Sequence, residues 1–218
     1  MRGDKLIIEA HHRSAAEAVK AHVGAAYADH PKPLIVSIGG ESGSGKSELG
    51  RALVDVFEAT ERHVLLLQQD DYFRLPPKSN DRKRRQEITW VGMGEVRLDL
   101  LDQHLDALRR GAREITKPLI DYEADEILEE TLAAAGAEIV IAEGTYTATL
   151  ENVDCRVFID RTYIQTEASR RRRARDAQDT FIERVLEIEH GIISKQISRA
   201  DILVTADYSV VTAAREST

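Results

Sequence analysis

The sequence predicts an α/β fold: a doubly wound, mostly parallel sheet of five strands flanked by helices, with an N-terminal strand–helix extension. Three observations carry this prediction. Five short apolar runs are continuous rather than alternating, as expected for strands that are covered on both faces. Segments with the apolar spacing of helices separate these runs. The first run leads straight into a glycine-rich turn, and such sheets bind ligands at the carboxyl ends of their strands.

The predicted strands are rich in β-branched residues: LIVSI (34–38), VLLL (64–67), EIVIA (138–142), RVFI (156–159) and DILVT (201–205). Three helices are predicted between them. One follows the glycine-rich turn, a second covers 98–108 and ends at Gly111, and a third begins near Asp179. We expect residues 34–218 to form one domain, because they contain no internal repeat and no long linker.

Residues 1–33 precede this pattern and are expected to pack on the core as an extension. The segment KLIIEA predicts an edge strand. Ser14 and Glu17 predict a capping box at the start of an alanine-rich helix, which Pro31 and Pro33 would stop. The extension also holds four histidines, for which solvated surface positions are favoured over a metal site: His11, His12, His22 and His30.

Composition limits the classes of partner. The net charge of −8 argues against general nucleic-acid binding, and no apolar run is long enough to span a membrane. The single cysteine, Cys155, lies beside an apolar run, which is typical of a buried thiol in a reducing compartment. We therefore expect a cytoplasmic protein. Local basic clusters at 82–85 and 170–175 suit a small anionic ligand, and the extension offers a surface for a homo-oligomer, whose existence the sequence leaves open.

The glycine-rich turn matches the P-loop pattern G-x-x-x-x-G-K-[ST]. Its glycines let successive backbone N–H groups point at phosphate oxygens, and the following helix adds its positive N-terminal dipole. Lys46 can reach the β- and γ-phosphates of a nucleotide, and the Ser47 hydroxyl can ligate Mg²⁺. The predicted ATP-binding residues of this motif are Gly40, Glu41, Ser42, Gly43, Ser44, Gly45, Lys46 and Ser47.

Acidic residues end two other predicted strands at the same edge of the sheet. Asp70 and Asp71 follow VLLLQQ, and a carboxylate there can accept the proton of an attacking hydroxyl or hold Mg²⁺ through water. Successive strand residues point to opposite faces, so the two aspartates should differ in role. A solvated turn is the alternative. Glu143 ends a strand that looks central, and an acid in that place usually assists the metal.

A run of arginines, SRRRRARD, precedes the last predicted helix. Arg171 and Arg175 share a helix face at i,i+4, and Arg172 shares one with Arg175 at i,i+3. Guanidinium groups on a lid can stabilise the charge of a transferring phosphoryl group and exclude water. The alternative is a solvated basic helix face.

Taken together, these motifs resemble those of the uridine kinase and phosphoribulokinase family of P-loop small-molecule kinases. The resemblance covers about 34–205 and rests on GGESGSGKS, QDDYF, IAEGTY, RRRARD and the helix LDLLDQHLDALRRG. It implies ATP and Mg²⁺ as cofactors and Asp70 as the general base on the substrate hydroxyl. It also implies that Ser47 and Glu143, with Asp70 close by, organise the metal. The implied catalytic groups are completed by Lys46, Arg172 and Arg175, and Arg171 is implied to bind ATP; the three arginines would be lid residues on the phosphates.

The positions that would read the substrate differ from those of uridine kinases. Gly92 stands where the family has an aspartate that contacts the nucleoside, and LIDYEAD replaces a Y-D-F-x-x-H-like loop. A pocket that loses such hydrogen-bonding groups discriminates strongly against its former substrate. The residues expected to contact the substrate instead are Asp71, Tyr72, Asp121 and Tyr122. An additional carboxylate at Asp71 favours a polyol or a cationic acceptor.

Three functions are compatible with these motifs. The first is a phosphotransferase that moves the γ-phosphate of ATP to a hydroxyl of a small metabolite, and each group this reaction needs has a candidate residue. The second is a nucleotide-driven regulatory ATPase or switch, although the N-K-x-D pattern of many GTPases is absent from the sequence. The third is an inactive scaffold, against which the intact Lys46, Ser47, Asp70 and Glu143 argue.

Overall fold

The computed structural model describes residues 6–27, 30, 33–167, 170 and 180–213 of the chain. Its helices and strands are α1 (Ala10–Ala26), β1 (Leu34–Gly40), α2 (Lys46–Glu58), β2 (Val64–Gln68), α3 (Pro77–Gln86), α4 (Leu98–Arg109), β3 (Glu114–Asp121), β4 (Glu126–Ala133), β5 (Ile139–Glu143), β6 (Cys155–Ile159), α6 (Thr180–Ile193), β7 (Ile202–Val204) and β8 (Val210–Thr212). Short 3-10 helices are η1 (Gln69–Tyr72), η2 (Ile88–Trp90), η3 (Met93–Glu95), η4 (Thr147–Thr149) and η5 (Ser194–Arg199). None of the described helices is both long and apolar enough to cross a membrane.

The central sheet has the strand order β2-β5-β1-β6-β7-β8. The first five strands in this order run parallel, and β8 pairs antiparallel with β7. The predicted fold class is therefore confirmed, with all five predicted strands present. The sixth strand was missed because β8 is short and largely exposed, so it has no apolar run to mark it.

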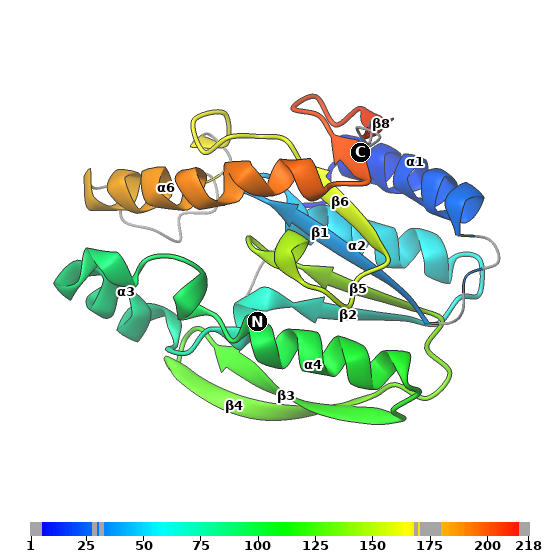
Figure 1. Cartoon of the computed structure of the whole chain (residues 1–218), viewed down its shortest axis with the longest axis horizontal. Helices are drawn as coiled ribbons and strands as arrows, with labels where there is room; N and C mark the ends of the chain where they lie inside the picture. The colour runs from blue at the N-terminus through cyan, green and yellow to red at the C-terminus, as the bar shows by residue number, and fades with distance from the viewer. Residues whose placement is uncertain (1–5, 28–29, 31–32, 168–169, 171–179, 214–218) are drawn as a thin grey trace.

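Alternate residues of the strands enter two hydrophobic cores, one on each face of the sheet, as the two-residue period of a strand requires. In β1, Val36 and Ile38 belong to the core beneath α1 and α2, whereas Ile35 belongs to the core beneath α4. Both faces are buried, which explains why the strands read as continuous apolar runs. Figure 1 shows α1 and α2 together on one side of the sheet and α4 on the other.

The N-terminal extension differs from its prediction in two ways. Residues 6–9 form no strand, and β8 fills the edge of the sheet beside β7. The capping box predicted at Ser14 and Glu17 is wrong, because α1 already begins at Ala10 and Ser14 is an exposed residue inside it. The Glu9 N–H instead donates to Nδ1 of His12 at 3.0 Å. Apolar side chains of α1 share the core of α2: Ala15, Ala16, Val19 and Val23.

Two elements had no prediction. The strands β3 and β4 form a separate antiparallel hairpin, in register from Glu114 opposite Ala133 to Asp121 opposite Glu126. It lies beyond α4 (Figure 1), and β3 packs against η1, the segment that follows β2. The second element, α3, connects η1 to the segment that leads into α4. Both elements border the candidate active site.

Candidate active site

The P-loop joins the end of β1 to the start of α2. Gly40 and Gly45 have φ angles of +148° and +99°, which L side chains rarely adopt. A Cβ atom at Gly40 would lie 2.9 Å from Oγ of Ser44 and 3.0 Å from the Ile159 carbonyl oxygen, so the loop is closed tightly around its own backbone. The buried Ser44 hydroxyl has no hydrogen-bond partner among the described residues. This polar cradle fits a ligand that is rich in oxygen atoms, as a phosphate is.

Lys46 and Ser47 lie where the motif predicts, at the first turn of α2. The Lys46 side chain is buried, and its ammonium donates to the Glu41 carbonyl oxygen at 2.8 Å, across the loop. The Ser47 side chain lies close enough to the Glu143 carboxylate to lower the pKa of that group. The helix start therefore brings one cation and one hydroxyl to the loop, beside the acid at the end of β5.

Glu143 lies at the centre of the sheet edge. The register places it opposite Ile38 of β1 on one side and Gln68 of β2 on the other. Gln68 Nε2 donates to Glu143 Oε1 at 3.1 Å. Burial, and then the nearby charge of Asp70, raises the pKa of Glu143 to about 7, although Lys46 acts in the opposite direction. Clustered carboxylates that raise each other's pKa are a common arrangement at functional sites.

Strand β5 lies between β1 and β2, so β2 is not the neighbour of the P-loop strand. Asp70 approaches Glu143 closely enough to raise its pKa, because β2 pairs with β5 and Gln68, two residues before Asp70, lies opposite Glu143. The hydroxyl of Ser47 and the carboxylates of Asp70 and Glu143 are thus grouped at one corner. Such oxygen donors are the ligands that Mg²⁺ takes from proteins, so the residues present fit this ion.

A pocket of about 180 Å³ opens on the other side of Asp70. Polar groups and an apolar wall line it together: Asp70, Phe73, Leu75, Pro77, Asn80, Asp81, Arg84, Ile120, Tyr122 and Ile182. These residues come from η1, α3, the β3–β4 hairpin and α6, which are far apart in the sequence. We call this cavity the acceptor pocket. A mixture of apolar walls and a few placed polar groups is typical of small-molecule sites.

Three of the four predicted substrate-binding residues do not line the acceptor pocket: Asp71, Tyr72 and Asp121. Asp71 is buried, and its carboxylate accepts from Lys117 Nζ at 2.7 Å and from the Ile120 N–H at 3.1 Å. Tyr72 is fully buried in the core, and its hydroxyl lies 2.9 Å from Nδ1 of His104. These assignments are therefore corrected. Within η1 only Asp70 of the three consecutive residues lines the pocket, and its neighbours hold η1 against β3 and α4.

The turn of the β3–β4 hairpin holds two predicted substrate-binding residues, of which one lines the acceptor pocket and the other shapes the turn. Tyr122 lines the acceptor pocket, whereas Asp121 accepts hydrogen bonds from the N–H groups of Glu123 and Ala124 and so shapes the turn. Asp125, in the same turn, accepts from the Lys78 N–H at 2.7 Å. This carboxylate caps the start of α3 from a distant part of the chain, which fixes one wall of the pocket.

Arg84 carries a buried charge cluster that sequence reasoning missed. Its Nε donates to Glu95 Oε2 at 2.6 Å, and its NH2 group donates to Glu95 Oε1 at 3.0 Å and to Glu189 Oε1 at 2.9 Å. The Glu95 side chain is 0% exposed. Burial raises the pKa of Glu189, and Arg84 opposes that effect. The available signal was the basic run at 82–85, but nothing in it distinguishes Arg84 from its exposed neighbours.

The residue after Glu189 reaches the P-loop. His190 Nδ1 lies 2.6 Å from Glu41 Oε1, and the other Glu41 oxygen accepts from the Tyr163 N–H at 2.5 Å. Arg170 lies nearby, since a Cβ atom at Gly43 would meet its Cγ at 2.7 Å. The predicted lid residues Arg171, Arg172 and Arg175 lie outside the described residues.

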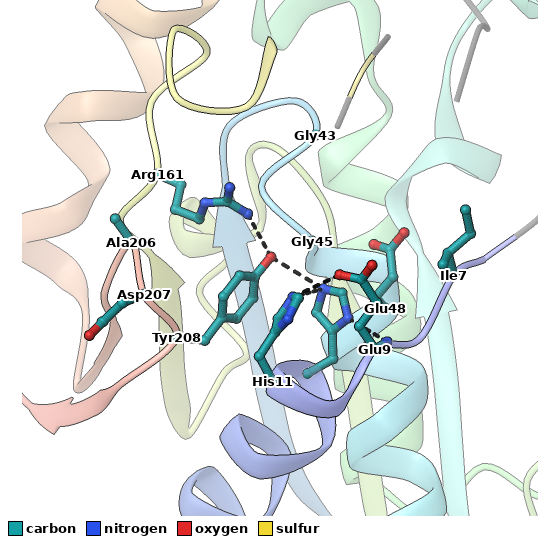
Figure 2. A pocket seen from close by; sticks show the side chains of 11 residues that line it. Ile7, Glu9, His11, Gly43, Gly45, Glu48, Arg161, Ala206, Asp207 and Tyr208 are labelled. Carbon is teal, nitrogen blue, oxygen red and sulfur yellow. Dashed lines mark hydrogen bonds and ion pairs between the residues drawn. The ribbon is translucent and has the colours of Figure 1, made fainter. Parts of the chain in front are cut away.

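A second pocket, of about 320 Å³, borders the P-loop and shares no lining residue with the acceptor pocket. Figure 2 shows its walls. They come from the N-terminal segment, the P-loop with the start of α2, and the chain around the ends of β6 and β7: Ile7, Glu9, His11, His12, Gly43, Gly45, Glu48, Arg161, Ala206, Asp207 and Tyr208. We call this cavity the extension pocket.

Comparisons with known proteins agree with this geometry. A uridine kinase from Bacillus pumilus is 29% identical over 153 residues, which cover 68% of this chain and 69% of that protein. A bifunctional alpha-galactosidase/sucrose kinase from Mediterraneibacter gnavus is 32% identical over 191 residues, or 81% of this chain. This chain spans only 20% of the length of that larger protein.

Among solved structures, a possible uridine kinase from Bacillus stearothermophilus has the same fold, with a TM-score of 0.61 and 19% identity over 88% of this chain and 97% of that one. The model of the phosphoribulokinase / uridine kinase family matches residues 35–212. That range includes the P-loop, Asp70, Glu143 and the acceptor pocket. The chain belongs to the phosphoribulokinase / uridine kinase family.

Proposed function

We propose that the protein transfers the γ-phosphate of ATP to a hydroxyl group of a small, non-nucleoside polyol or sugar. The observation that carries this proposal is the position of Asp70, which lies between the P-loop corner and the acceptor pocket. On one side it approaches Glu143, and on the other it lines the acceptor pocket. A carboxylate in that place can accept the proton of the hydroxyl that attacks a phosphate held in the loop.

The transfer follows from these positions. Backbone N–H groups of the P-loop and the ammonium of Lys46 hold the phosphates of ATP. The acceptor oxygen forms a bond to the γ-phosphorus while the bond from that phosphorus to the β–γ bridging oxygen breaks, and ADP leaves. The hydroxyl proton passes to the Asp70 carboxylate. When bound, Mg²⁺ neutralises charge on the phosphate oxygens, and Ser47, Asp70 and Glu143 are the residues that would hold it.

The class of acceptor is inferred from the pocket and from the relatives. The sequence-based expectation of an acidic pocket rested on Asp71, which is buried and paired with Lys117. Asp81 lines the pocket instead; its side chain is 43% exposed and also pairs with Arg85 at 2.8 Å. The carboxylates of Asp70 and Asp81 can accept hydrogen bonds from hydroxyls, while Tyr122 and the apolar wall can pack on carbon atoms. The Asn80 amide is held between Glu95 and the Trp90 indole and so fixes the wall of the pocket. The relative named for sucrose kinase activity also supports a sugar. No observation supports the regulatory ATPase, which needs no acceptor pocket.

A panel of acceptors tests the proposal. The purified chain is incubated with ATP and Mg²⁺, and ADP formation is followed with sugars, sugar alcohols, hydroxy acids and nucleosides added one at a time. We expect turnover with a sugar or polyol, with the phosphorylated product identified by mass spectrometry. Best turnover with uridine or cytidine would contradict the acceptor class. ADP formation that no acceptor stimulates would contradict phosphotransfer itself.

A further inference from the structure

The N-terminal segment reaches the P-loop although it lies outside the family match, which begins at residue 35. Ile7, Glu9 and the first turn of α1 form one wall of the extension pocket, opposite Gly45 of the P-loop. Figure 2 shows His11, Tyr208 and Arg161 gathered around this pocket. A side chain at Gly45 would collide with this group, because a Cβ atom there would lie 2.3 Å from the Tyr208 hydroxyl.

A chain of hydrogen bonds attaches the start of α1 to the loop. The Glu9 N–H donates to Nδ1 of His12 at 3.0 Å, so in neutral His12 the proton lies on Nε2. That Nε2 is 3.2 Å from the Tyr208 hydroxyl, which itself donates to the Ser44 carbonyl at 2.8 Å. Arg161 NH1 donates to the same hydroxyl at 2.8 Å. The roles are mutually consistent: the hydroxyl accepts twice and donates once.

The hydrogen bond from the Glu9 N–H to His12 Nδ1 argues against a metal site in the extension pocket. Ligand atoms of Glu9, His11 and His12 lie within 4.8 Å of one another, which is close enough for one ion. A histidine that binds a metal through Nε2 needs a lone pair there and usually donates its Nδ1 proton to an acceptor. His12 has the opposite arrangement, since its Nδ1 accepts a hydrogen bond from the Glu9 N–H. His12 Nε2 is therefore a donor, with the Tyr208 hydroxyl and His11 Nε2 each 3.2 Å away as acceptors.

We propose that the start of α1 is part of the nucleotide site and that His11 contacts the base of the nucleotide whose phosphates lie in the P-loop. This inference rests on the proposed function, which places phosphates at the loop and the acceptor at Asp70. The base must then occupy space that borders the P-loop but lies outside the acceptor pocket, and the extension pocket meets both conditions. Flat rings are good partners for a base, and those of His11 and Tyr208 lie 4.2 Å apart, tilted by 41°.

His11 is the member of this group that can be changed most cleanly. Its side chain is 39% exposed. His12 is almost fully buried and belongs to the hydrogen-bond chain that holds the P-loop. His11 Nε2 lies 3.2 Å from His12 Nε2, but His12 keeps its bonds to Glu9 and Tyr208 without it, so a truncation at His11 should remove the contact with the base and leave the loop in place. The matched control is His22, on the same helix, whose ring lies 2.8 Å from the Ala18 carbonyl oxygen and does not line the pocket.

The experiment compares two probes by calorimetry on the full chain. ATP carries phosphates and a base, whereas inorganic tripolyphosphate carries phosphates alone. We expect His11→Ala to weaken ATP binding about tenfold, in the range that loss of base stacking produces, and to leave tripolyphosphate binding within about twofold. His11→Phe, which keeps a flat ring, should restore most of the ATP affinity. His22→Ala should change neither probe.

The outcomes separate this inference from the function on which it rests. Equal weakening of both probes by His11→Ala would overturn it, because the effect would then act through the loop and not the base. Unchanged ATP binding in His11→Ala would also overturn the inference about His11. In that case, ATP binding by the unaltered chain would still support the proposed function. Failure of the unaltered chain to bind ATP would overturn both. With an acceptor in hand, the KM for ATP should rise in His11→Ala while kcat stays the same.

Discussion

Replacing Arg84 with methionine tests the buried charge cluster that joins α3, η3 and α6. Methionine keeps a long apolar stem but removes the guanidinium, so the two carboxylates that it serves lose their counter-charge. Glu95 is 0% exposed and Glu189 is 12% exposed, so water cannot replace the lost hydrogen bonds. Breaking a buried ion pair by removing one partner costs about 3–5 kcal/mol, because the other charge is left buried and uncompensated.

The expected cost can be read from thermal unfolding. At about 2–4 °C per kcal/mol for a chain of this length, Arg84→Met should lower the melting temperature by at least about 6 °C. Arg82→Met is the matched control on the same helix. The Arg82 side chain is 67% exposed and lies 3.7 Å from Asp125, so its loss should cost less than about 1 kcal/mol.

A second substitution separates charge from packing. In Arg84→Met, the pKa of Glu189, which burial already raises, should rise further, so the stability deficit should narrow as the pH falls and this carboxylate becomes protonated. Adding Glu95→Gln should recover part of the loss at neutral pH, because the amide does not carry the uncompensated charge. A deficit below about 1 kcal/mol, or one that Glu95→Gln deepens, would refute the reasoning that charge compensation holds these elements together.

Three further predictions concern single residues. Asp70→Asn should lower acceptor-dependent turnover by roughly 10²- to 10⁴-fold while ATP affinity, measured by calorimetry, stays within about threefold; surviving transfer would place the base elsewhere. Burial lowers the pKa of His12 from 6.5 to about 4, so its stability contribution is complete above pH 6.5 and is lost as the pH falls toward 4. This titration can lower the free energy of unfolding by at most about 3 kcal/mol. The test measures the free energy of unfolding of the unaltered chain and of His12→Gln between pH 6.5 and 4. A difference between the two proteins that stays constant over this pH range would contradict the prediction. Asp125→Ala should cost about 1 kcal/mol in thermal unfolding by uncapping α3, and Asp125→Asn, which keeps an acceptor and tolerates the positive φ of 57°, should cost less; equal losses would argue against capping.

The features that were predictable from the sequence are those with local signals. The P-loop combines a strand, fixed glycines and a helix start within fifteen residues, 36–50, so its position needs no long-range information. Strands β1, β2, β5, β6 and β7 show as apolar runs because both faces of the sheet are covered. The strand order was not predictable from these runs. Because β5 lies between β1 and β2, Glu143 at the end of β5, and not Asp70 after β2, lies beside the P-loop strand.

The acceptor side was poorly predicted because its supports are long-range. Helix α3 has the sequence PKSNDRKRRQ, without an apolar period, and it is held by a cap from Asp125 and by the buried pairing of Arg84. Neither partner is adjacent in the sequence. The roles within QDDY were equally hidden, because the 3-10 turn of η1, and not a strand alternation, turns Asp71 toward Lys117 and leaves Asp70 at the pocket.

One helix joins the two halves of the site. Glu189 of α6 accepts from Arg84, which lines the acceptor pocket, while the next residue, His190, contacts Glu41 of the P-loop. Because packed helices move as rigid elements, a shift of α6 must displace both contacts together. We therefore expect loss of Arg84 to affect the phosphate cradle as well as the acceptor pocket. Turnover of Arg84→Met would mix these effects, and for that reason the test of the charge cluster is a measurement of stability.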